Sequence, residues 1–119
     1  MKKISYWLPV IIWCSLIFFL SSFHKLEASP VGWQDFIIRK TAHFTEYAIL
    51  FVLFYRAFKN TTKYSFKKII WLALLAGIAY ALTDEYHQTL VAGRTGRPFD
   101  IIIDALGIFF GSLVIRRIR

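Results

Sequence analysis

The sequence contains little cysteine and comparatively little charge. Cys14 is the only cysteine among 119 residues, so no disulfide within the chain can hold the fold together. Charged residues make up 18 %, against about 25 % in an average soluble domain. A short chain has a high surface-to-volume ratio, and a soluble version of this one would expose much apolar surface. These deficits exclude a disulfide-stabilised fold and an ordinary small soluble domain.

The sequence is instead rich in apolar residues. They account for 57 % of the chain, aromatic residues for 18 %, and the mean hydropathy is +0.52. Apolar stretches of about 17–25 residues are long enough to cross a membrane as helices. The sequence predicts an all-α integral membrane bundle of four transmembrane helices, which forms a single domain over residues 1–119. The expected spans are about 6–23, 40–58, 69–90 and 99–115.

The connections between these stretches are short. Residues 33–39 are interpreted as an amphipathic entry turn, and residues 60–68 as a polar, basic loop. Residues 91–98 contain Gly93, Gly96 and Pro98, which favour a loop. The first apolar stretch is longer than the roughly 7–15 residues of a signal-peptide core, so we expect an uncleaved helix.

Basic residues predict the orientation in the membrane. Most of them fall at the two termini and between the second and third spans. The positive-inside rule then places both termini in the cytoplasm, in the plasma membrane, with membrane lipids as partners. No basic face with base-stacking groups is evident, so no nucleic-acid partner is expected.

All seven acidic residues and all three histidines fall on the outer side or in the outer half of the predicted spans. With a helix rise of 1.5 Å per residue, Glu46, Asp84 and Asp104 each lie about 7–9 Å in from the outer end of a different span. A charged residue at mid-span costs roughly 2.5–3.5 kcal/mol, and less towards the interface. These carboxylates are therefore expected to be paired, protonated or bound to a ligand.

Local explanations for these residues remain open. Glu46 with His43, and Asp84 with His87, have the i, i+3 spacing of neutralising pairs on one helix. Asp100 has the position of an N-terminal helix cap. Because the groups gather in one layer instead of scattering along the spans, we favour a functional site.

Arg94 and Arg97 flank Thr95 and Gly96 in the last loop. Two guanidiniums on a glycine-containing loop are suited to a phosphate or carboxylate, which arginine binds in a bidentate manner. The alternative is that they form salt bridges to Asp84, Glu85 or Asp100. The phosphate-binding pattern G-x-x-x-x-G-K-S/T is missing, so nucleotide binding has no support.

Together these residues resemble the VanZ-like membrane protein family over nearly the whole chain. The matching motifs are Lys40-x-x-His43-Phe44-x-Glu46-Tyr47, Asp84-Glu85-x-His87-Gln88, Gly93-Arg94-x-x-Arg97 and Asp100-x-x-x-Asp104-x-x-Gly107-x-x-x-Gly111, with Ser21-Ser22 at the end of the first span. The family often has Asn where this chain has Asp104. The resemblance implies a cell-envelope protein connected with antibiotic resistance, namely reduced susceptibility to the glycopeptide teicoplanin.

The leading hypothesis is a pocket facing the outer leaflet that binds or processes an amphipathic anionic ligand: a lipid, a lipid-linked cell-wall intermediate or a lipoglycopeptide. If the protein is an enzyme, a hydrolase or group transferase is expected. The catalytic candidates are His43, Glu46, Asp84, Glu85, His87 and Asp104. The ligand-binding candidates are Lys40, Gln88, Arg94, Arg97 and Asp100.

Two other classes of function stay open. One is a non-catalytic envelope or resistance factor that acts by binding or by contact with a partner, and the other is proton or ion translocation. No cofactor is indicated by a recognised signature, although two histidines and several carboxylates are also ligand types for a divalent metal. Gly107 and Gly111 predict close helix packing, either within the chain or across a dimer.

Overall fold

The computed structural model describes residues 2–21, 32–90 and 98–118. These residues form four α-helices and no β-strand: α1 (Lys2–Ser21), α2 (Gly32–Thr61), α3 (Phe66–Leu90) and α4 (Pro98–Ile118). The predicted all-α fold is confirmed.

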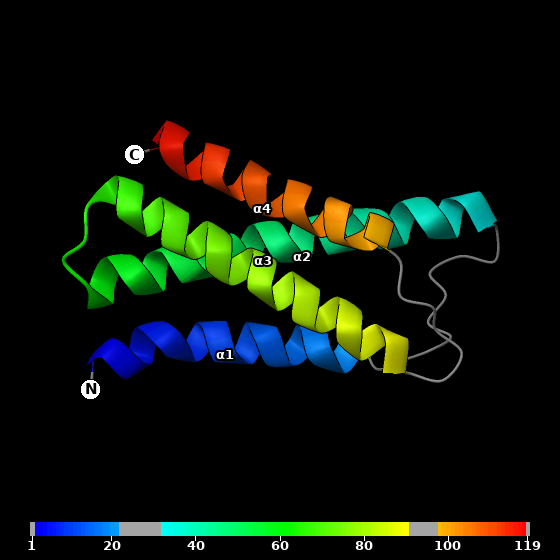
Figure 1. Cartoon of the computed structure of the whole chain (residues 1–119), viewed down its shortest axis with the longest axis horizontal. Helices are drawn as coiled ribbons and strands as arrows, with labels where there is room; N and C mark the ends of the chain where they lie inside the picture. Colours follow the sequence, from blue (N-terminus) through cyan, green and yellow to red (C-terminus); the bar gives the residue numbers. More distant parts are fainter. Residues whose placement is uncertain (1, 22–31, 91–97, 119) are drawn as a thin grey trace.

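The helices form an elongated bundle of 47 × 29 × 20 Å (Figure 1). Helix α2 is the longest and contacts each of the other three, while α1 and α4 lie on opposite sides of the α2–α3 pair. Both termini and the α2–α3 turn lie at one end of the bundle (Figure 1). The end of α3 and the start of α4 therefore lie towards the other end.

The structure corrects each of the three predicted connections, the last of them only at Pro98. The entry turn expected over residues 33–39 is helical, because α2 begins at Gly32 and no glycine or proline follows to interrupt it. The loop expected over residues 60–68 is reduced to residues 62–65. Pro98, placed in a loop by the sequence, is the first residue of α4, where its missing N–H is not needed. Residues 91–97 of that loop lie outside the described part of the chain.

Polar side chains define the ends of the short α2–α3 turn. The side chains of Thr61 and Thr62 donate hydrogen bonds to the carbonyls of Ala57 and Phe58 in the last turn of α2. The Ser65 hydroxyl accepts a hydrogen bond of 3.3 Å from the backbone N–H of Lys68, as an N-cap does for the first turn of a helix. The turn is short because both helix ends are capped locally.

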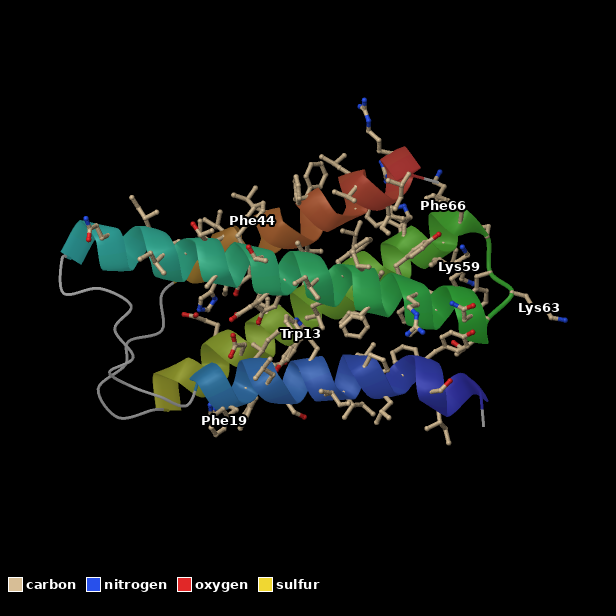
Figure 2. All side chains as sticks on the ribbon, turned by 180° about the vertical axis from the view of Figure 1, so that it is seen from behind. Trp13, Phe19, Phe44, Lys59, Lys63 and Phe66 are labelled. Carbon is tan, nitrogen blue, oxygen red and sulfur yellow. The ribbon has the colours of Figure 1, made fainter. Side chains whose placement is uncertain are left out.

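Helices α2 and α4 approach closely through the two glycines that the sequence singled out. A β-carbon on Gly107 would overlap the carbonyl oxygen of Phe44, and one on Gly111 would lie 2.9 Å from the carbonyl oxygen of Ala48. The two glycines thus serve packing within the chain. Figure 2 shows Phe44 on α2 beside α4, and its ring packs on Phe110 with centroids 5.5 Å apart.

Every helix exposes large apolar side chains on the outer surface of the bundle. Large exposed side chains include Ile11 on α1, Ile37 on α2, Trp71 and Leu75 on α3, and Phe109 on α4. Among the described residues, one stretch, Phe66–His87, is both long and apolar enough to cross a membrane, and the apolar stretch Ile4–Phe19 is shorter. The buried core lies between α2 and its three neighbours.

Candidate functional site

A histidine and a carboxylate from different helices meet between α2 and α4. His43 Nδ1 lies 3.1 Å from Asp104 Oδ1, within hydrogen-bonding distance. Asp104 is buried, and the His43 side chain keeps 20 % of its surface exposed. A carboxylate at one ring nitrogen orients the imidazole and determines which nitrogen carries a proton. The close approach at Gly107, one turn along α4 from Asp104, brings the two side chains within reach.

A second buried carboxylate comes from α3. The Tyr47 hydroxyl donates a hydrogen bond of 3.0 Å to Asp84 Oδ2. Asp84 is 2 % exposed and Tyr47 fully buried, so this hydrogen bond is shielded from water. Tyr47 lies one helical turn after His43 on α2, which places both residues on the same face of that helix.

The two pairs form one cluster. One ligand-type atom each from His43, Asp84 and Asp104 lies within 4.8 Å of the others. The three residues come from α2, α3 and α4, so the cluster exists only when these helices are packed together. We call these three residues the His–Asp cluster.

Further charged residues predicted for the site surround the His–Asp cluster. The charge of Glu46 acts on His43, Asp84 and Asp104. The charge of Lys40 acts on Asp104 and on Glu85, which is partly buried. Among the residues that the structure describes, the carboxylates nevertheless outnumber the basic groups in this part of the bundle, so a bound metal cation or proton would be stabilised there.

His87 is not among the three residues of the His–Asp cluster. Its ring stacks on Phe18 of α1, with centroids 4.0 Å apart and an angle of 26° between the planes. Helix α1 also contacts the site region through Trp13, whose indole Nε1 donates a hydrogen bond of 3.0 Å to the backbone carbonyl of Glu46 (Figure 2). Helix α1 therefore packs against α2 and α3, two of the helices that carry the cluster.

Four of the predicted ligand-binding residues cannot be placed in this arrangement. Arg94 and Arg97 lie outside the residues that the structure describes, as do the side chains of Gln88 and Asp100. Their predicted roles stay predictions.

The sequence-based reasoning assigned no role to Tyr47 or Trp13. Tyr47 could have been recognised by its i+4 spacing from His43, which puts it on the inward face of α2. Trp13 donates to a backbone carbonyl, so no sequence pattern indicates its contact.

Tyr47→Phe is expected to destabilise the folded chain by about 1–3 kcal/mol, because it removes the donor to a buried carboxylate and leaves the ring in place. Thermal unfolding of the purified protein in detergent measures the loss. Tyr64→Phe, on an exposed tyrosine in the α2–α3 turn, is the matched control and should change stability little. Equal stability of the two variants would contradict the contribution assigned to the Tyr47–Asp84 hydrogen bond.

The fold and the cluster define a small helical protein with an apolar exterior and a buried His–Asp cluster shared by three helices. The chain belongs to the VanZ/LLP1 family, whose model matches residues 6–119. This match confirms the resemblance to VanZ-like proteins that the motifs indicated. No curated protein and no solved structure shows significant similarity to the chain.

Proposed function

We propose that the four helices span the plasma membrane, with both termini in the cytoplasm. Membership of the VanZ/LLP1 family and the apolar length of Phe66–His87 support this proposal. The large apolar side chains exposed on all four helices are the surface expected of a bundle in contact with lipid. In water the same side chains would drive aggregation.

The distribution of charge supports the orientation. Lys59 and Lys63 lie at the end of the bundle that carries the termini, and Lys63 extends away from it (Figure 2). Arg116 and Arg117 lie in the last turn of α4, at the same end. Asp84 is six residues, or about 9 Å, from the opposite end of α3. The positive-inside rule then puts the His–Asp cluster in the outer half of the membrane.

The function we propose is binding and processing of an amphipathic ligand with an anionic head, such as a lipid or a lipid-linked cell-wall intermediate, from the outer leaflet. The observation that carries this proposal is the convergence of His43, Asp84 and Asp104 from three helices. Buried ionisable groups in a membrane segment are costly, and in membrane proteins they commonly mark functional sites. Arg94 and Arg97, by their sequence positions, are the proposed contacts for the head.

Hydrolysis or group transfer at the anionic head is the proposed reaction class. With Asp104 at Nδ1, the other ring nitrogen of His43 is the atom suited to exchange a proton with a ligand. It would accept the proton of the attacking water or hydroxyl and return it to the leaving group. Asp104 would orient the ring and stabilise its charged form.

Comparison of cells that carry His43→Gln, Asp104→Ala or the unchanged protein, at equal membrane abundance, tests this proposal. We expect the variants to lose most of any effect of the protein on envelope lipid composition and on teicoplanin susceptibility, as removal of a proton-transferring group costs about 10²–10⁴-fold in rate. Thr45→Val, on the exposed face of α2, is the matched control and should behave like the unchanged protein.

The outcomes separate the proposal from a non-catalytic role. Loss of the effect in stably folded variants supports a working site. Loss only in proportion to lowered thermal stability indicates a non-catalytic envelope factor, in which the buried residues serve folding. An unchanged effect in both variants contradicts the proposed site.

A further inference from the structure

The His–Asp cluster has the donor set of a metal centre as well as that of a proton-transfer site. An imidazole nitrogen and two carboxylate oxygens, from His43, Asp84 and Asp104, can approach one point from three helices. Three protein ligands with a further position left for water or substrate are typical of catalytic zinc sites, whereas structural sites use four. Imidazole with carboxylates suits Zn²⁺ and Mn²⁺, whereas Ca²⁺ takes six to eight oxygen ligands.

The distances are compatible with one ion. Ligand atoms at about 2.1 Å from a common ion lie roughly 3–4 Å from one another. His43 Nδ1 and Asp104 Oδ1 are already 3.1 Å apart, and no pair among the three ligand atoms is separated by more than 4.8 Å. These separations are close to those expected for three donors around one ion.

The surroundings have two further features of a metal centre. The Tyr47 hydroxyl holds one oxygen of Asp84, as outer hydrogen bonds commonly orient ligating carboxylates. Glu46 is a third carboxylate near the two buried carboxylates of the cluster, and Lys40 and His43 are the basic groups beside them among the described residues. A divalent cation would balance the charge of both buried carboxylates.

We propose that His43, Asp84 and Asp104 bind one divalent transition-metal ion, Zn²⁺ or Mn²⁺, which takes the place of the proton between His43 and Asp104. This inference rests on the proposed function in one respect, namely that the cluster is the working site. The bound cation would then contact the anionic head of the ligand, while the reaction class stays hydrolysis or group transfer. His43 would serve as a ligand of the cation instead of carrying the proton.

Metal binding by the full chain, purified in detergent without a polyhistidine tag, tests the inference. The protein is stripped with a chelator, dialysed against Zn²⁺ or Mn²⁺, and its metal content is determined by mass spectrometry. We expect one ion per chain and a rise in the thermal unfolding temperature with ion concentration, since an ion that binds the folded chain stabilises it by mass action. Ca²⁺ is expected to produce neither effect.

Three single variants locate the ion. His43→Gln, Asp84→Ala and Asp104→Ala are each expected to weaken binding by at least about tenfold. Thr45→Val is the control, because it changes an exposed residue of α2 whose hydroxyl bonds to its own helix and lies outside the cluster. It should bind the ion as the unchanged chain does.

The wild-type measurement does not depend on how the variants fold. Absence of Zn²⁺ and Mn²⁺ binding by the folded wild-type chain overturns the inference and leaves the proton-transfer form of the proposed function in place. Binding that persists in all three variants also overturns it. Binding that is lost in the three variants supports the inference, even where the cellular effects of the protein turn out not to require these residues and the proposed function fails.

Discussion

Gly107→Ala is expected to destabilise the folded chain by about 3 kcal/mol, near the upper end of the usual cost of overpacking. The added β-carbon would overlap the carbonyl oxygen of Phe44, and backbone atoms inside a helix cannot rotate out of the way. Helices α2 and α4 must then separate at this level. Thermal or denaturant unfolding in detergent measures the loss.

Gly77→Ala is the matched control for this substitution. It adds the same methyl group to another helix interior, but the nearest atom is Ile108 Cδ1 at 3.0 Å, the end of a flexible side chain. The higher helix propensity of alanine, worth about 1 kcal/mol over glycine, offsets the cost of moving that side chain. Gly77→Ala should therefore change stability little. A loss as large as that of Gly107→Ala would contradict the special role of the α2–α4 contact.

The second large effect is expected at His43 and Asp104. Removal of one partner of a hydrogen-bonded pair leaves the other polar group without compensation, which costs about 1–3 kcal/mol and reaches the upper end for a group that can be charged. His43→Leu and Asp104→Leu are each expected to destabilise the chain by this amount. The double variant should lose clearly less than the sum of the two, since it leaves neither polar group behind. Unfolding of the four proteins in detergent completes the double-mutant cycle.

A pair that does not interact provides the comparison. Thr45→Val changes an exposed residue of α2 whose hydroxyl bonds to its own helix, so its effect should add to that of Asp104→Leu without coupling. Strict additivity of His43→Leu and Asp104→Leu would show that the 3.1 Å contact contributes nothing to stability.

Gly107 connects these two effects. It lies one turn along α4 from Asp104, and the atom its β-carbon would meet belongs to Phe44, next to His43. Separation of α2 and α4 at Gly107 therefore also lengthens the His43–Asp104 contact. This geometry explains how a residue without a side chain supports the candidate site.

The helices were predictable from the sequence, but some of their ends were not. Apolar stretches of membrane-spanning length indicated four helices, and the structure contains α1 to α4 in the residues it describes. The start of α2 at Gly32 was missed because residues 33–39 are mixed in polarity and form no continuous apolar stretch. The length of the α2–α3 turn was overestimated. The hydrogen bonds of Thr61 and Ser65 extend both helices into polar sequence, so fewer residues remain in the turn.

The membership of the candidate site was partly predictable. Helix rise alone places Asp84 and Asp104 at one depth, and helical spacing places His43 on an inward face. The spacing of residues along one helix does not determine which side chains of other helices they contact. The sequence suggested Glu46 as a partner of His43 and His87 as a partner of Asp84. The structure adds contacts that the spacing did not indicate: His43 with Asp104, Asp84 with Tyr47, and His87 with Phe18.

By itself, the sequence determined that this protein is helical, apolar on the outside and a member of the VanZ/LLP1 family, because these properties depend on composition, periodicity and motif order. Only the tertiary structure decided that Gly107 and Gly111 pack α4 against α2 within one chain, and that His43, Asp84 and Asp104 share one cluster. The reason is physical. The contacts of a side chain with other helices depend on their rotation and separation, and these are determined by packing between residues far apart in the chain.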